Sequence, residues 1–434
     1  MNSQSIQVLQ FGTGNFLRGF IEPLIEELNR QGESLQVCLV QSTDGSTLQG
    51  LRAQDYAYSL YVAGMEQGKS IEQFQEITCI KDGLSLPSDS KKFLSLALSQ
   101  ELKYIISNVT EAGLVWKQEG LKDQIASSFP GRLTQWLYTR FEQAPELETI
   151  LLPCELIPNN GDFLKSLIQQ HALAWKLDAE FLNWINLNCR FFNTLVDRIV
   201  PGFPKQLAEK VAPYTVQVEP YLFWGIEGSD QDLEKLPFRK GKGVVLTDSL
   251  ISYTKRKISI LNGLHTYLAA FGMLKQIKTV QEYVQDTDRL HALNLLVEEE
   301  IFPFLNQPLD SLRDYTSAIF DRFKNPYMAH ALHDISLQSI AKFKSRLLPI
   351  CTYFLEKKGI LPPRITGGMV ALLLCHLRCP ELMRDTEETK HYFKQLQAKD
   401  ESELDNVIQA SQELFGIEDR ISLELAYANL NTQP

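Results

Sequence analysis

Short apolar runs alternate with helical patterns in the first part of the chain. The pattern predicts strands at residues 6–11 and 35–40, with an amphipathic helix at 16–29 between them. Further apolar runs at 104–107 and 149–153 predict two more strands, each followed by polar or small residues. Strands that alternate with helices are typical of a parallel sheet, so we expect an α/β fold with an N-terminal Rossmann-like, doubly wound domain.

From about residue 250 onward, long helical patterns replace this alternation. Short breaks that contain proline or glycine separate them. We therefore predict a Rossmann-like domain over residues 1–248 and a mostly α-helical substrate and catalytic domain over residues 249–434. The helical patterns fall at 253–274, 279–300, 328–356, 367–377 and 401–415.

The charge balance narrows the classes of partner. The 434 residues include 43 Lys and Arg against 53 Asp and Glu, which gives a net charge of −10. A broad acidic surface repels phosphate backbones and anionic lipids, so we expect neither a nucleic-acid nor a membrane partner. The longest apolar run, Met369–Cys375, is far shorter than the roughly 20 residues of a membrane span. This balance does not exclude a small anionic substrate.

The seven scattered cysteines and an N-terminus without a signal-peptide pattern favour a cytoplasmic protein with free thiols. Only Cys375, His376 and Cys379 lie close together. They lack a second pair of ligands and belong to a strongly apolar segment, which favours a buried helix face over a metal site. We therefore expect no metal. No pattern in the sequence specifies an oligomeric state.

A glycine turn follows the first predicted strand and precedes the first predicted helix. Gly12 permits a tight turn, and Gly14 lets the backbone approach a pyrophosphate at the helix N-terminus, next to Asn15 and Phe16. The third glycine position of the dinucleotide-binding fingerprint holds Leu17, so a plain turn remains the alternative. The placement of the turn nevertheless favours a nucleotide site.

The end of the second strand carries the residues that contact the cofactor ribose in such folds. Asp44 is the nearest acidic candidate, although Gln41 occupies the more usual position. Residues 41–50 contain no Arg or Lys, and a 2′-phosphate usually meets a cation. The segment therefore favours NAD over NADP.

A second group of polar residues interrupts the apolar helical stretch 252–269. At about 100° per residue, Asn262 and His265 lie about 60° apart, and Lys257 lies about 80° from His265. A buried Lys with a lowered pKa can exchange a proton with an alcohol or carbonyl, while an Asn amide can stabilise an alkoxide. His265 can orient substrate hydroxyls. The alternative is a surface Lys257 beside a helix irregularity at Asn262.

The pattern K-x4-N-x2-H resembles the catalytic signature of the long-chain mannitol dehydrogenase family, whose members are metal-independent polyol and hexuronate dehydrogenases. Residues 10–20 (QFGTGNFLRGF) resemble its cofactor turn, and residues 107–113 resemble a further loop on the nucleotide side. Residues 192–201 and 322–327 resemble its N-x-x-V-D-R-I and R-F-x-N-P segments. The matches occur in order over most of the chain.

The resemblance implies NAD as the cofactor and a role for each matched residue. Lys257 is the expected acid–base group, Asn262 holds the developing negative charge, and His265 and Lys342 bind neighbouring hydroxyls. The loop that contacts the cofactor comprises Ser107, Asn108, Thr110 and Glu111, and further substrate-binding residues are Asp197 and Arg198.

Residues 153–162, 195–202 and 342–349 resemble the branch of the family that reduces hexuronates, so we expect a sugar-acid substrate. Two departures argue against mannitol. Leu156 replaces an Asn of the polyol enzymes, which leaves Asn160 or a neighbour to supply the second oxyanion amide. Asp334 replaces an Arg, so contacts at the far end of the substrate differ.

A sugar acid also needs a cation for its carboxylate. The sequence offers several, although adjacent cations such as Lys255 and Arg256 are more often a solvated helix end. Alternative functions are fructuronate/mannonate or mannitol-type polyol dehydrogenation on the same fold, or, in another class, a catalytically silent NAD-binding sensor. The cations available for the carboxylate are Arg198, Lys255, Arg256, Lys324 and Arg346, and those expected to form a local cationic pocket are Lys257, Lys342 and Arg198.

Overall fold

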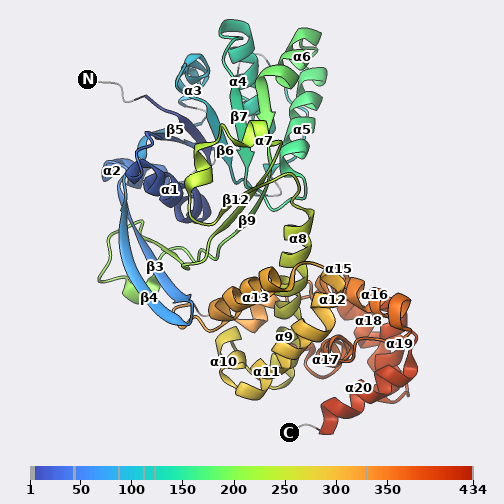
Figure 1. Cartoon of the computed structure of the whole chain (residues 1–434). Helices are drawn as coiled ribbons and strands as arrows, with labels where there is room; N and C mark the ends of the chain where they lie inside the picture. Colours follow the sequence, from blue (N-terminus) through green and yellow to red (C-terminus); the bar gives the residue numbers. More distant parts are fainter. Residues whose placement is uncertain are drawn as a thin grey trace. The chain divides into compact units, whose positions relative to one another are not determined.

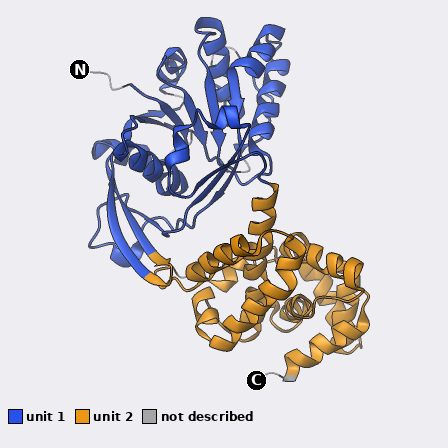
Figure 2. Ribbon diagram, in the orientation of Figure 1, with its two compact units in different colours: residues 1–63, 70–250 blue, residues 64–69, 251–434 orange. Residues whose placement is uncertain are grey.

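The chain forms two compact units (Figure 1, Figure 2). Unit 1 comprises residues 1–63 and 70–250, and unit 2 comprises residues 64–69 and 251–434. The structure is a computed structural model. It describes residues 5–42, 45–86, 88–110, 113–121, 124–328 and 330–432.

Unit 1 is built on a six-stranded sheet in which every neighbouring pair is parallel. Numbered along the chain, its strands lie in the order 3-2-1-4-5-6, which is the order of a dinucleotide-binding doubly wound sheet. The predicted fold class is therefore confirmed. The strands, from one edge to the other, are β5 (Ile80–Ser85), β2 (Val37–Gln41), β1 (Val8–Phe11), β6 (Tyr104–Ser107), β7 (Thr149–Pro153) and β8 (Cys189–Phe191).

Apolar side chains cover both faces of this sheet, because successive residues of a strand point to opposite sides. In β2, Val37 and Leu39 belong to one buried cluster, while Cys38 and Val40 belong to the other. The covering helices of unit 1 are α1 (Asn15–Arg30), α2 (Thr47–Ala53), α3 (Ser90–Ser95), α4 (Phe129–Gln143), α5 (Asn160–Ala174) and α6 (Ala179–Asn188).

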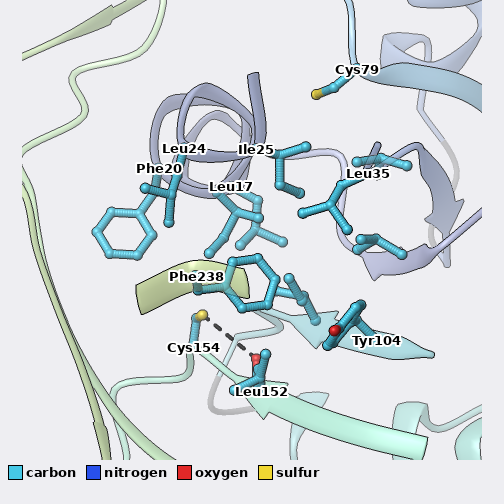
Figure 3. Close-up of a cluster of buried hydrophobic side chains, with 14 of the residues drawn as sticks. Leu17, Phe20, Leu24, Ile25, Leu35, Cys79, Tyr104, Leu152, Cys154 and Phe238 are labelled. Carbon is cyan, nitrogen blue, oxygen red and sulfur yellow. Dashed lines mark hydrogen bonds between the residues drawn. The ribbon is translucent and has the colours of Figure 1, made fainter. Parts of the chain in front are cut away.

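Helix α1 supplies much of the first cluster. Leu17, Phe20, Leu24 and Ile25 lie in this cluster with apolar side chains of the sheet (Figure 3). Phe238, from the short 3-10 helix Pro237–Lys240, packs in the same cluster. The apolar face of the predicted helix 16–29 therefore fixes α1, and with it the glycine turn that precedes α1.

Two small sheets that the strand pattern did not predict belong to unit 1, except for the hairpin tip at residues 64–69, which is part of unit 2. One has the order β10-β3-β4 and the other the order β12-β11-β9. Strands β3 and β4 form a long hairpin whose turn residues, Gln67 and Gly68, both have positive φ. The strands are β3 (Tyr58–Glu66), β4 (Lys69–Ile77), β9 (Asn193–Asp197), β10 (Val216–Val218), β11 (Phe223–Glu227) and β12 (Val244–Thr247).

Unit 2 contains helices throughout its residues 251–432. Its first segment is α8 (Ile251–Lys257), a π-helical turn η5 (Ile258–Asn262) and α9 (Gly263–Leu274). The helices that follow are α10 (Val280–Gln285), α11 (Thr287–Leu296), the π-helical turn η6 (Val297–Ile301), α12 (Phe302–Leu305), α13 (Leu309–Phe323), α14 (Leu332–Ile335), α15 (Ser339–Arg346), α16 (Leu348–Lys358), α17 (Pro363–Arg378), α18 (Glu387–Gln397), α19 (Glu403–Phe415) and α20 (Arg420–Thr432).

The single helix expected over 328–356 is wrong, because three shorter helices occupy this stretch. Gln338 has a left-handed backbone, with φ of 53°, between α14 and α15. Pro349 lies in the first turn of α16, where its missing N–H is tolerated, whereas inside a continuous helix it would break the chain of hydrogen bonds. This division places the side chains of α15 beside those of α9.

Candidate functional site

The glycine turn lies where ligands bind in a doubly wound sheet. It follows β1, whose neighbours β2 and β6 are connected in opposite directions, so the strand order reverses at this point. Gly12 has a φ of +119°, and a Cβ there would lie 3.4 Å from the carbonyl oxygen of Asn108. Gly14 precedes α1, is exposed, and leaves the helix N-terminus without a side-chain cap. A pyrophosphate fits such an end.

A buried glutamine fixes the first half of this turn. The Nε2 of Gln10, in β1, donates to the carbonyl oxygen of Gly12 at 3.0 Å and to Oε1 of Glu22 at 2.7 Å. Tyr58 donates to Oε2 of Glu22 at 2.6 Å. Burial raises the pKa of Glu22. Sequence reasoning missed this network, although a polar residue inside an apolar strand was a visible signal for it.

The second half of the turn is held by Arg18, which is buried in α1. Its Nε donates to the carbonyl oxygen of Thr13 at 3.2 Å, and its Nη1 donates to that of Tyr214 at 2.9 Å. Its Nη2 donates to Oδ1 of Asn15 at 2.7 Å. Arg18 therefore ties the turn to a distant segment of unit 1.

Two of the predicted cofactor residues use their side chains within the protein. The amide oxygen of Asn15 accepts the hydrogen bond from Arg18, and the ring of Phe16 stacks on Phe20 with centroids 5.0 Å apart. At these two positions, the main chain at the start of α1 is therefore the part suited to a nucleotide. The predicted Asp44 lies outside the described residues.

We expect the substitution Arg18→Met to cost unit 1 about 3 kcal/mol, because three hydrogen bonds of a buried charged group are lost. Urea unfolding followed by tryptophan fluorescence measures this loss, since every tryptophan of the chain belongs to unit 1. The matched control is Arg30→Met, at the exposed end of the same helix, with an expected change below about 0.5 kcal/mol. Equal losses in the two variants would contradict the anchoring role. The tryptophans are Trp116, Trp136, Trp175, Trp184 and Trp224.

The loop after β6 continues the nucleotide side of the sheet. Ser107 is buried at the end of β6, and Nδ2 of Asn108 donates to the carbonyl oxygen of Cys154 at 2.7 Å. The predicted Thr110 is exposed, and the predicted Glu111 lies outside the described residues. Asn108 therefore serves to fix this loop against the loop after β7.

The structure does not support an oxyanion role for Asn160. This residue is fully buried, and its Nδ2 donates at 3.0 Å to the carbonyl oxygens of Pro153 and Glu155. Its Oδ1 accepts a hydrogen bond from the main chain of Thr194 at 2.8 Å. Because the whole amide joins the end of β7 to β9, no donor remains for a substrate. Leu156, the departure that suggested this role, is exposed.

The guanidinium of Arg198 also makes its hydrogen bonds within the protein. Its Nη1 donates to the carbonyl oxygen of Gly19 at 2.8 Å, and its Nε and Nη2 donate to that of Glu219 at 3.0 and 2.8 Å. Burial lowers the pKa of Arg198 to about 10. The expectation that it contacts the substrate is therefore not supported. Its predicted neighbour Asp197 is buried at the end of β9.

In unit 2, the three predicted catalytic residues lie around the π-helical turn η5. Half-buried Lys257 ends α8, Asn262 ends η5, and His265 lies in the first turn of α9. The uniform step of about 100° per residue does not hold through η5, because a π turn bonds residues five apart. The angular argument therefore applies to the pair Asn262 and His265 alone. Such turns are frequent at functional sites.

A cavity of about 220 Å³ brings together four of the predicted residues, which lie on two helical segments far apart in the sequence: Asn262, His265, Lys342 and the candidate cation Arg346. Lys257 is not among its lining residues. Sequence reasoning missed His330, for which no spacing gave a signal. The cavity is lined by Asn262, His265, His330, Asp334, Ile335, Lys342 and Arg346.

The ring of His265 is buried in this cavity wall, between His330 and Phe323, with centroid distances of 4.7 and 4.8 Å. Its Nε2 has no hydrogen-bond partner among the described residues. Burial, followed by the charges of His330 and Arg322, holds the pKa of His265 well below its usual value. The ring is therefore neutral, and a polar group of a ligand would satisfy its Nε2.

This lowered pKa predicts a dependence of stability on pH. The unfolded chain binds a proton at His265 below about pH 6.5, whereas the folded chain does not, so stability falls as the pH decreases. We expect the contribution of His265 to approach about 1.4 kcal/mol per pH unit. Unfolding of His265→Asn and of the unsubstituted protein, followed by circular dichroism from about pH 7 to about pH 5, measures it. Parallel curves would contradict the prediction.

Two cations give the cavity its charge. Nζ of Lys342 donates to the carbonyl oxygen of Ile335 at 2.9 Å, and burial followed by the charge of Arg346 lowers the pKa of Lys342. Burial lowers the pKa of Arg346 to about 10. The one acidic lining residue, Asp334, is paired with Arg384 at 2.9 Å. The cavity is therefore suited to an anion.

The other candidate cations serve other contacts. Nζ of Lys255 donates to the carbonyl oxygen of Phe304 at 2.9 Å and lies 3.9 Å from the centre of that ring. The guanidinium of Arg256 lies 4.3 Å from the ring centre of Tyr315. Lys324 lines a separate cavity of about 330 Å³. Lys255 and Arg256 therefore hold neighbouring helices rather than forming a solvated helix end.

The described residues show neither a metal-binding cluster nor a membrane-spanning helix. Among the described residues, no group of three or more His, Cys, Asp and Glu side chains is arranged to hold a metal ion. Cys375 and His376 are buried in α17, and Nε2 of His376 lies 3.2 Å from Oδ2 of Asp385. None of the helices described in the structure combines the length and apolar character that crossing a lipid bilayer requires.

A doubly wound nucleotide-binding sheet followed by a helical unit with a polar cavity defines the class of two-domain dehydrogenases. The model of the mannitol dehydrogenase Rossmann domain matches residues 6–239, and that of the mannitol dehydrogenase C-terminal domain matches residues 249–419. The chain belongs to the mannitol dehydrogenase family, which confirms the resemblance that its motifs indicated.

Curated relatives indicate which branch of the family this chain resembles. The altronate oxidoreductase of Bacillus subtilis (strain 168) is 36% identical over 411 residues, which cover 92% of this chain and 85% of that protein. The altronate oxidoreductase of Bacteroides thetaiotaomicron is 34% identical over 380 residues, which cover 85% of this chain and 79% of that protein. These relatives agree with the expected likeness to the hexuronate branch.

Two solved structures share the fold. D-sorbitol dehydrogenase in substrate-free form has a TM-score of 0.81 and 22% identity, and the match covers 97% of this chain and 92% of that one. Mannitol 2-dehydrogenase of Pseudomonas fluorescens, in a ternary complex with NAD and D-mannitol, has a TM-score of 0.70 and 22% identity, with 99% and 92% covered. At this identity the likeness concerns the fold alone.

Proposed function

We propose that the protein is an NAD-dependent tagaturonate reductase that interconverts D-tagaturonate and D-altronate without a metal. The observation that carries the proposal is the cationic cavity of unit 2, where Lys342 and Arg346 accompany Asn262 and His265. A neutral polyol needs no such charge, whereas a hexonate does. Altronate oxidoreductases from several bacteria, at 33–36% identity, support the same substrate.

The residues of unit 1 fit a dinucleotide. Gly12 has the backbone conformation and close packing that the fingerprint turn requires, and the N-terminus of α1 lacks a side-chain cap. The absence of Arg and Lys from residues 41–50 favours NAD over NADP. When bound, NAD supplies the hydride chemistry of the nicotinamide ring.

The residues of unit 2 supply the proton chemistry and the orientation of the substrate. In oxidation, Lys257 accepts the hydroxyl proton of altronate, and in reduction it returns that proton to the carbonyl oxygen of tagaturonate. The amide of Asn262 donates to the alkoxide that develops on the same oxygen. His265 and Lys342 bind neighbouring hydroxyls.

The seven cysteines are all free thiols, and free thiols are typical of a reducing compartment such as the cytoplasm.

The test is a set of steady-state assays of the purified enzyme. The substrates are altronate, mannonate and mannitol with NAD, and tagaturonate and fructuronate with NADH. We expect kcat/KM to be highest for the altronate and tagaturonate pair, lower with NADP, and unchanged by a chelator. Preference for mannonate and fructuronate, or for mannitol, would identify a sister enzyme. NADH binding without turnover of any substrate would identify the silent sensor.

A further inference from the structure

We propose that the guanidinium of Arg346 binds the carboxylate of the substrate and thereby makes this cavity select sugar acids over neutral polyols of the same length. The identity of the acid rests on the proposed function, whereas the preference for an acid rests on the cavity alone. Of the two cations in the cavity lining, Arg346 is the one whose unused N–H donors lie side by side in one plane.

The hydrogen bonds of Arg346 leave one edge of the guanidinium available. Nη1 donates to the carbonyl oxygen of Asn262 at 3.2 Å and to Oγ1 of Thr266 at 3.0 Å. Nε and Nη2 make no hydrogen bond with any residue that the structure describes. These two nitrogens form the edge that binds a carboxylate through two parallel hydrogen bonds.

The charge of Arg346 also lacks a counterion. No described carboxylate forms an ion pair with it, and the one acidic residue of the cavity lining, Asp334, is paired with Arg384. Lys342 lies one helical turn before Arg346 on α15, so two like charges share one face. Two half-buried like charges so close together repel each other, and a bound carboxylate offsets that repulsion.

Lys342 is less suited to the same task. Its ammonium group already donates to the carbonyl oxygen of Ile335 at 2.9 Å, and an ammonium is a point charge without the planar fork of a guanidinium. Arg346, by contrast, is fixed by Nη1 to Asn262, the residue assigned to the reacting oxygen. The carboxylate contact and the oxyanion contact are therefore held at a constant separation.

The experiment compares Arg346→Gln with the unsubstituted enzyme on altronate and on altritol, the neutral polyol in which a CH2OH group replaces the carboxylate. We expect KM for altronate to rise about 30-fold or more, with a smaller change in kcat, while activity on altritol hardly changes. NADH affinity, measured by calorimetry, should stay constant. The matched control is Lys344→Gln, exposed on the same helix, which should leave all of these constants unchanged.

A second pair of variants separates carboxylate binding from folding. Arg346→Lys keeps the charge without the fork and should show an intermediate KM for altronate. Thr266→Val removes one anchor of Nη1 and should raise KM less than Arg346→Gln does. Addition of guanidinium ion to Arg346→Ala should restore part of the activity on altronate and none of the activity on altritol.

The outcomes distinguish this inference from the proposed function. If the enzyme prefers another hexonate and Arg346→Gln raises the KM for that acid, the proposed function fails and the inference holds. If Arg346→Gln leaves KM for the preferred acid unchanged, the inference is overturned even when that acid is altronate. Equal kcat/KM for altronate and altritol in the unsubstituted enzyme would also overturn it.

Discussion

Replacing Lys257 with alanine is expected to lower kcat about 10³-fold while leaving NADH binding nearly unchanged. Lys257 ends α8 in unit 2, immediately before the π turn that carries Asn262. The features suited to the dinucleotide belong to unit 1. Loss of the acid–base group therefore removes the proton acceptor for the alcohol without altering the cofactor turn. Stopped-flow measurement of single-turnover oxidation of altronate gives the change directly.

Chemical rescue makes this prediction specific. A small primary amine should restore part of the activity of Lys257→Ala, because it fits the space left by the side chain and accepts the same proton. The matched control, Lys344→Ala, removes an exposed lysine of unit 2 and should retain full activity. If Lys257→Ala turns over at a near-normal rate, the proton-transfer role belongs to another group.

The sequence predicted the elements of unit 1 that depend on local patterns. Strands β1, β2, β6 and β7 and helix α1 lie within a few residues of their expected positions, since each carries its own apolar periodicity. The glycine turn was predictable for the same reason, because a turn between a strand and a helix is a local feature. The β3–β4 hairpin was missed because β4 is largely exposed and lacks an apolar run. The division of 328–356 was missed although Pro349, which starts a helix and interrupts a longer one, was a local signal for it.

Partners of polar side chains were harder to predict. Asn160 and Arg198 have the residue types of a binding site, yet Asn160 bonds a main chain 34 residues away and Arg198 one 21 residues away. Arg346, listed only as one of several cations, reaches Asn262 over 84 residues. Whether an amide or guanidinium meets a backbone or a ligand depends on such distant contacts, and no spacing within the sequence reports them.

The second large effect is expected at Asn262, where alanine should lower kcat about 10²- to 10³-fold. The Asn262 side chain lines the cavity and makes no hydrogen bond within the described part of the chain, so its amide can donate to a developing alkoxide. Its carbonyl oxygen has a separate role, because it accepts from Arg346 at 3.2 Å and from Thr266 at 3.0 Å. Alanine keeps that carbonyl and removes the amide alone.

The kinetic constants distinguish an oxyanion contact from a ground-state contact. An interaction made only in the transition state lowers kcat and kcat/KM equally, so KM for altronate should stay nearly constant in Asn262→Ala. Asn262→Asp should be slower still, because a carboxylate repels the alkoxide that the amide stabilises. The matched control, Asn294→Ala, removes an exposed amide of α11 and should leave kcat unchanged. A rise in KM with an unchanged kcat would instead assign Asn262 to uniform binding of the substrate hydroxyls.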